Sequence, residues 1–140
     1  TQTNVCRVTN YILTWDPNIL TIQQKDEPAN AFTDATSVFT FTNEYTPKTI
    51  EFVNSNNTKH WKYEIQLNQQ NHVTSYAFYN KGQIANILEI NYIKKPNSDK
   101  ITIEKITNIY DEGICILQKN SRTGKSRSRD LYTGEWSGWQ

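Results

Sequence analysis

The strongest constraint on the fold is a strict two-residue alternation of apolar and polar side chains. The segment WKYEIQL, residues 61–67, has its Trp, Tyr, Ile and Leu at odd positions and its Lys, Glu and Gln at even positions. Successive side chains of a β-strand point to opposite faces, so this segment predicts a strand with one apolar and one wet face. Residues 88–92 and 101–104 repeat the alternation.

Turn residues separate these segments at regular intervals. Asn71 and Gly82 are suited to left-handed backbone and lie 11 positions apart (82 − 71). That rhythm is typical of an antiparallel meander. We expect seven strands between residues 37 and 118, with two more from the first 25 residues on either side of a break at Asp16-Pro17-Asn18. Residues 30–35 could form a helix, but one too short to matter.

These observations predict an all-β fold, an antiparallel meander or small β-barrel of about 8–9 strands with little helix. The 140 residues suit a single β domain. We divide it into N-terminal strands and loop (1–36), a β-meander core (37–118), a basic loop (119–131) and an aromatic C-terminal strand or flap (132–140).

Two copies of one turn stand 31 residues apart (110 − 79), as YNKGQIAN from Tyr79 and YDEGICIL from Tyr110. In each, Asn or Asp starts a turn and Gly supplies the positive φ. A calcium site at Asp111 and Glu112 is the alternative. Calcium takes six to eight oxygen ligands, and the first copy has Asn and Lys there, so we interpret both copies as turns.

This Tyr-[Asn/Asp]-x-Gly-x-apolar pattern resembles the YD-type hairpin repeats of bacterial extracytoplasmic proteins, including the repeat-built outer-surface lipoproteins. The resemblance covers about residues 38–117, and the segment LNQQNHV matches with Asn71 in place of Gly. It implies a structural or binding module. No catalytic residue carries over, because the shared pattern defines turns.

The sequence also indicates an oxidising compartment. It has no Met and begins TQTNVC, as a mature exported chain or a cloned fragment would, and it has no apolar run long enough to span a membrane. We expect Cys6 and Cys115 to form a disulfide, with a reactive thiol or a lipid-modified Cys6 as alternatives. The expected location is extracytoplasmic: periplasmic, secreted or cell-surface, after signal peptide removal.

No motif marks catalysis. His60 and His72 are the two histidines, and no G-x-S-x-G, HExxH or phosphate-binding glycine loop occurs. The carboxylates of Asp26 and Glu27 are sequence neighbours, which does not make them face one another across a cleft. We therefore predict no catalytic, cofactor-binding or metal-binding residues, no cofactor, and a protein that is not an enzyme.

The C-terminal tail is the most unusual stretch. Residues 119–129 hold five basic residues and no acid, whereas residues 1–118 hold ten basic (15 − 5) and twelve acidic ones (14 − 2). Aromatic residues then follow. The tail predicts contact with a protein, polyanionic or glycan partner, and the alternatives are a solvated loop and aromatics buried against the core. Nucleic acid is a poor fit to a nearly neutral chain. The candidate residues are Lys119, Arg122, Lys125, Arg127, Arg129, Tyr132, Trp136 and Trp139.

Together these features predict an exported, non-enzymatic binding or structural β-module of bacterial origin. One alternative is a periplasmic inhibitor or immunity-type protein that neutralises a hydrolase or toxin through a protruding ordered loop. Another is a lipocalin-like small-ligand carrier, which requires an enclosed apolar interior.

Overall fold

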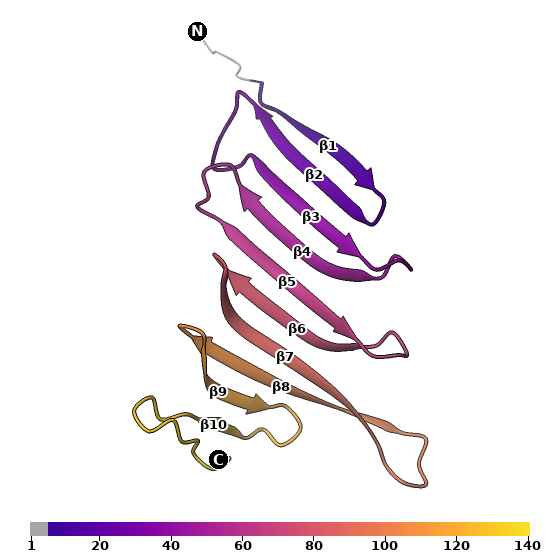
Figure 1. Cartoon of the computed structure of the whole chain (residues 1–140), viewed down its shortest axis with the longest axis vertical. Coiled ribbons are helices and arrows are strands. Elements are labelled where there is room, and N and C mark those ends of the chain that lie inside the picture. Colours follow the sequence, from indigo (N-terminus) through magenta and orange to yellow (C-terminus); the bar gives the residue numbers. More distant parts are fainter. Residues whose placement is uncertain (1–5) are drawn as a thin grey trace. The chain divides into compact units, whose positions relative to one another are not determined.

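A computed structural model of the chain describes residues 6–140, and all their regular structure is β. Ten strands follow one another in chain order in one antiparallel sheet (Figure 1), and this sheet is not closed into a barrel. The strands are β1 (Val8–Asp16), β2 (Ile19–Glu27), β3 (Ala35–Phe41), β4 (Pro47–Asn54), β5 (His60–Leu67), β6 (Val73–Asn80), β7 (Gln83–Lys94), β8 (Ile101–Asp111), β9 (Ile114–Asn120) and β10 (Ser126–Ser128).

The predicted meander is therefore confirmed, and the barrel alternative is wrong. The seven strands expected between residues 37 and 118 correspond to β3–β9, and the two expected before them are β1 and β2. The tenth strand lies inside the stretch that we expected to be a basic loop. Residues 30–35 form turns and the start of β3, with no helix. Among the described residues, no helix is present that could cross a membrane.

The chain divides into two compact units, residues 1–62 and 63–140. In the first unit the strand register separates an apolar face from a polar one, because directly paired residues lie on the same face. One row across β1–β4 is Leu13, Ile22, Ser37 and Phe52, and the next is Trp15, Leu20, Phe39 and Ile50. The opposite face carries rows such as Thr14, Thr21, Val38 and Glu51.

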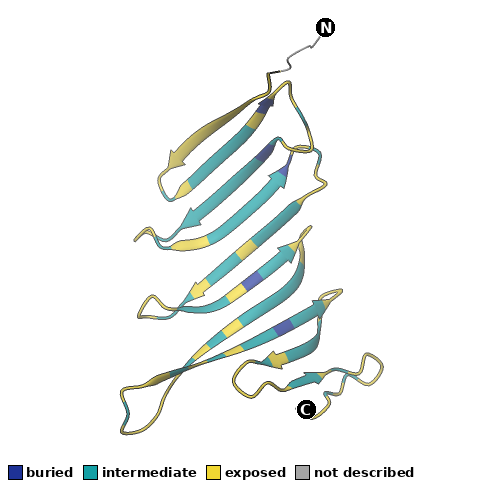
Figure 2. Cartoon of the chain, turned by 180° about the vertical axis from the view of Figure 1, so that it is seen from behind, coloured by how far each residue is buried: buried dark blue, intermediate teal, exposed yellow. Residues whose placement is uncertain are grey.

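Aromatic contacts on this apolar face hold neighbouring strands together. The rings of Trp15 and Phe41 have centroids 5.5 Å apart, and those of Phe52 and Trp61 stack at 5.3 Å. Even so, few of these side chains are fully covered, and most strand residues are half-buried (Figure 2). Among residues 6–140 the buried apolar side chains are Ala35 and Ala77.

Polar side chains take the best-protected positions instead. The buried ones are Asp26, Asn54 and Asn108. The amide of Asn54 donates to the Phe32 carbonyl (3.2 Å) and the Thr58 hydroxyl (2.7 Å), and its oxygen accepts from the Lys59 backbone N–H (2.8 Å). Asn54 thus ties the loop before β3 to the β4–β5 turn.

Asp26 makes a second such link in the first unit. Its carboxylate accepts hydrogen bonds from the hydroxyls of Thr33 and Thr9. These bonds favour the charged form, so Thr33 first and Thr9 second hold the pKa of Asp26 below its usual value.

In the second unit, the two copies of the repeated turn have the same backbone. Gly82 and Gly113 have φ of 78° and 80°, and the residues before them, Lys81 and Glu112, have φ of 50° and 49°. Two consecutive positive φ values make a two-residue type I′ hairpin turn, which matches the twist of the strands. The register also shifts at the same place in both copies, immediately before Tyr79 and before Tyr110. The predicted turns are confirmed, as is the left-handed Asn71, with φ of 62°.

The predicted disulfide is wrong. Cys6 and Cys115 are both free; Cys6 precedes β1 and Cys115 lies in β9. In the strand order β1 and β9 are not neighbours, so no strand pairing brings these two thiols together. Residues 1–5, which contributed to the expectation of export, lie outside the described part of the chain.

The fold predicts that Asn54→Ala lowers the free energy of unfolding by about 1–3 kcal/mol, because the Lys59 N–H and the Phe32 carbonyl lose their partner. Urea unfolding followed by circular dichroism measures this. The matched control is Asn10→Ala, since the amide of Asn10 bonds Glu27 in solvent. Equal losses in both variants would contradict a special role for Asn54.

Candidate binding surface at the C-terminal end

The organising contact of the C-terminal end is an arginine held between two tryptophans. The guanidinium carbon of Arg127 lies 4.9 Å from the ring centroid of Trp136 and 4.8 Å from that of Trp139. A cation over an aromatic face is attracted by the negative charge of the ring surface. The last five residues also pair with β10: Ser126 and Gln140 exchange two backbone hydrogen bonds, and the Ser137 N–H donates to the Ser128 carbonyl.

A ladder of polar side chains extends from Arg127 across three further strands. The Nε of Arg127 donates to the Gln118 side-chain oxygen (2.6 Å), and the Gln118 amide donates to the Asn108 side-chain oxygen (2.7 Å). Asn108 in turn donates to the Ile87 carbonyl (3.2 Å). The register places Ile87, Asn108, Gln118 and Arg127 in one row, so this ladder fixes β7–β10 side by side.

Two turns on either side of β10 share one pattern, [Asn/Asp]-x-x-Thr-Gly-x, which the sequence analysis missed. In residues 120–125 and 130–135, the side-chain oxygen of Asn120 or Asp130 accepts hydrogen bonds from the backbone N–H groups two and three positions later. The remaining three hydrogen bonds of the turn are also identical in the two copies. The glycines, Gly124 and Gly134, have φ of 69° and 76°. The signal was visible as NSRTGK and DLYTGE, spaced ten residues apart.

The second of these turns presents two large side chains to solvent. Leu131 is 66% exposed and Tyr132 is 100% exposed. Backbone N–H donation from Thr133 and Tyr132 holds the pKa of Asp130 below its usual value. The Arg129 guanidinium adds a bond to the Gly134 carbonyl (3.1 Å). The backbone that carries Tyr132 is therefore fixed while its ring is free.

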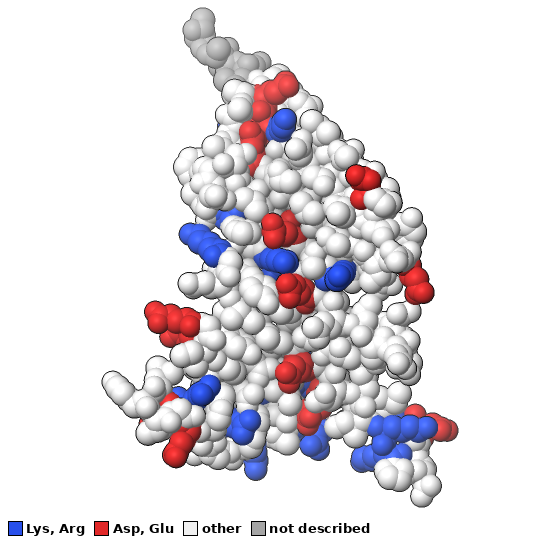
Figure 3. Space-filling model, in the orientation of Figure 1, with Lys and Arg blue, Asp and Glu red and all other residues white. Residues whose placement is uncertain are grey.

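Three lysines line a shallow hollow of about 390 Å³ beside the first of these turns. They are Lys105 from β8, Lys119 from β9 and Lys125 at the end of the turn, and Asn120, Ser121 and Ser126 also line the hollow. Figure 3 shows basic side chains gathered over the part of the second unit where β8–β10 lie. Lys119 and Gln118 are consecutive in β9, so the hollow and the polar ladder lie on opposite faces.

Of the eight predicted partner-binding residues, five make contacts within the chain and three face the hollow or solvent. Arg127, Trp136 and Trp139 engage one another, and Arg129 bonds the second turn. Arg122 lies 2.9 Å from the Glu104 carboxylate, and together with Asn120 and Asn91 it holds the pKa of Glu104 below its usual value. Lys119 and Lys125 face the hollow, and Tyr132 faces solvent. Sequence reasoning missed Lys105, because it lies in β8 and precedes the tail in the sequence.

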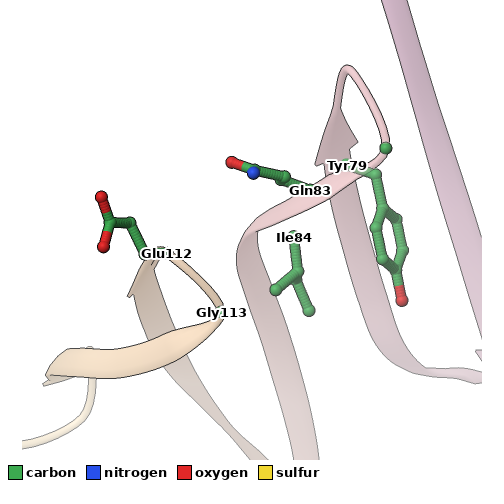
Figure 4. Close-up of a pocket in the computed structure, with 6 residues that line it drawn as sticks. Tyr79, Gln83, Ile84, Glu112 and Gly113 are labelled. Atoms are coloured by element: carbon green, nitrogen blue, oxygen red, sulfur yellow. The ribbon is translucent and has the colours of Figure 1, made fainter.

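The repeated type I′ turns form a second hollow, of about 620 Å³ (Figure 4). Gln83 and Glu112 project from the two turns, while Ile84 and Tyr79 lie below them. The Tyr79 hydroxyl is 3.4 Å from a Glu64 carboxylate oxygen. One carboxylate and one amide around an open space do not form a nucleophile with its base, so this hollow is the gap between two turns.

The remaining reactive side chains are dispersed. His60 lies 3.8 Å from a Glu51 carboxylate oxygen, and the ring of His72 contacts that of Tyr92 at 5.3 Å. Burial raises the pKa of the Cys115 thiol, which disfavours the reactive thiolate. No group of three or more His, Cys, Asp and Glu side chains suited to a metal ion occurs among residues 6–140.

Comparison with protein-family models, with curated proteins and with solved structures gave no match to this chain.

The contact of Arg127 with Trp136 and Trp139, here called the clamp, predicts that Arg127→Lys destabilises the C-terminal end by about 1–2 kcal/mol. Lysine keeps the charge but lacks the planar guanidinium group. Urea unfolding and amide hydrogen exchange at Ser126 and Gln140 measure this. Arg122→Lys is the matched control, since Arg122 is on the surface, and it should leave exchange at these amides unchanged. If both variants speed exchange equally, the clamp does not organise the tail.

Proposed function

We propose that this protein is a non-enzymatic binding module that holds a partner bearing several anionic groups in the hollow lined by Lys105, Lys119 and Lys125. The observation that carries the proposal is the convergence of these three lysines, from separate places in the sequence, on one hollow without an acidic residue in its lining. The hydroxyl groups of Ser121 and Ser126, two further residues of the lining, can donate hydrogen bonds to the same anions.

The physical reason is local charge. The whole chain has a formal net charge of +1, so it does not attract anions strongly as a whole. Three like charges around one concave surface raise the local positive potential, which an anionic partner relieves. A lysine ammonium is a compact point charge on a flexible stem, which suits clustered carboxylates or sulfates of varied geometry.

The proposal includes export from a bacterial cell, and this part rests on the resemblance of the repeated turn sequences to the hairpin repeats of bacterial extracytoplasmic proteins. Because both cysteines are free, the proposed export has no support from a disulfide. The lipocalin-like alternative requires an enclosed interior, which an open sheet does not supply.

The proposal predicts that replacing Lys105, Lys119 and Lys125 together by Glu weakens binding to anionic probes by more than about tenfold. The probes are poly-glutamate and a sulfated polysaccharide, each measured by titration at low and at moderate salt. The wild-type chain should bind more weakly as salt rises, because screening reduces the attraction. Which of the two probes binds more tightly separates an acidic protein partner from a glycan.

The matched control changes three lysines elsewhere in the same unit, Lys94, Lys95 and Lys100, to Glu. It alters the net charge equally and lies in and around the β7–β8 connection. Binding that drops equally in both triple variants would show a general charge effect and would overturn the hollow as the site. Absence of binding to either probe by the wild-type chain would overturn the proposal itself.

A second candidate function is an inhibitor that inserts a loop into the cleft of a hydrolase. The observation that favours it is the fully exposed ring of Tyr132 on a turn whose backbone is fixed by five hydrogen bonds. A rigid loop loses little conformational entropy when it binds, and tyrosine supplies a large contact area with few rotatable bonds.

This candidate predicts that the chain slows peptidoglycan hydrolysis by lysozyme and that Tyr132→Ala reduces inhibition by at least about tenfold. The folded state should be unaffected, because the ring contacts solvent, and thermal unfolding checks this. Tyr45→Ala, which removes another exposed tyrosine from the first unit, is the control. Undiminished inhibition by the Tyr132 variant would exclude this loop as the inhibitory element.

A further inference from the structure

The first strand of the sheet has an open edge. All nine residues of β1 are exposed, and within residues 6–140 it has one neighbour, β2. Leu13 is 63% exposed, Trp15 51% and Ile12 46%. In an antiparallel pair, alternate residues turn their backbone N–H and C=O groups away from the partner strand. The outer side of β1 therefore presents a row of donors and acceptors about 30 Å long, with apolar side chains above and below.

This edge lacks the devices that keep sheet edges from pairing. Natural edge strands are commonly short or bulged, or they carry lysine or proline. β1 is nine residues long, with an unbroken register to β2, and it has neither residue type; its one charge is Asp16, at the end.

The opposite end of the strand order is treated differently. β10 has three residues, and the chain itself covers its outer side, since Ser137 and Gln140 bond back to Ser128 and Ser126. The adjoining part of β9 is covered as well, because the Arg129 N–H donates to the Ile116 carbonyl. One edge is thus closed by the chain's own residues, and the other is left open.

We propose that the edge of β1 pairs with β1 of a second copy of this chain, antiparallel and with Ile12 opposite Ile12 of the second copy. This register pairs all nine residues of each strand. Asp16 then lies opposite Val8, so no like charges meet, and Asn10 lies opposite Thr14, which can share a hydrogen bond with it. The strand is therefore complementary to itself in charge and polarity.

The same register joins the apolar faces of the two copies. Tyr11 lies opposite Leu13 of the second copy, and Trp15 lies opposite Thr9, all on the face that carries the apolar rows of the first unit. Aromatic and aliphatic cross-strand pairs of this kind stabilise sheets. The contact is one strand wide and falls at the low end of interface sizes, below about 1,200 Å², so the dimer is reversible and concentration-dependent.

The test uses the 140-residue chain and two charge variants at the two-fold position, Ile12→Lys and Ile12→Glu. Sedimentation velocity over a range of concentrations should show a monomer–dimer equilibrium for the wild type. Each variant alone should be monomeric at concentrations where the wild type is half dimeric, because like charges face each other across the axis. An equimolar mixture of the two variants should restore the dimer.

The matched control is Ile19→Lys. Ile19 is 44% exposed, which is similar to the 46% of Ile12. It lies in β2, away from the open edge, so the dimer should persist. A wild-type chain that stays monomeric at its highest soluble concentration would overturn the proposal. So would a dimer that survives both Ile12 variants but is lost in Leu13→Lys, because that result would indicate stacking of the apolar faces in place of edge pairing.

Discussion

Within each unit, the described strands form a single sheet layer, and this constraint governs the rest of the structure. Most domains bury the apolar face of a sheet against another sheet or against helices. Here the described strands form one open sheet, and two alanines are the buried apolar residues of the described chain. Stability must then come from backbone pairing, from cross-strand contacts such as Phe52 with Trp61, and from polar side chains that join loops to strands, as Asn54 does.

Turns fix much of the strand register, because a strand without a core to define its faces can slip in register. The chain uses two solutions repeatedly. The type I′ turns at Gly82 and Gly113 share their dihedral angles and the register shift beside them. The turns that begin at Asn120 and Asp130 share five hydrogen bonds. Each repeat fixes the register of a hairpin locally, so the meander can extend without contacts between distant strands.

Sequence reasoning recovered what local pattern determines. Alternation located the strands from Ala35 to Asn120, and Gly82 and Asn71 located turns, because these depend on neighbouring residues. It could not decide between an open sheet and a barrel, since both give the same alternation. The predicted disulfide was wrong because the number of cysteines does not determine whether two thiols lie side by side. In the tail, composition identified the basic residues. It could not show that Arg127 contacts Trp136 and Trp139, or that Lys105 lines the same hollow as Lys119 and Lys125.

The two ends of the strand order face the same physical problem with different outcomes. An uncovered edge on both sides would allow head-to-tail addition of copies without limit, which produces fibres. Because residues 136–140 pair with β10, one side of each copy is already occupied. Pairing of β1 with itself about a two-fold axis then uses the remaining edge of both copies and leaves none for a third. The short C-terminal flap would thereby limit assembly to a closed dimer.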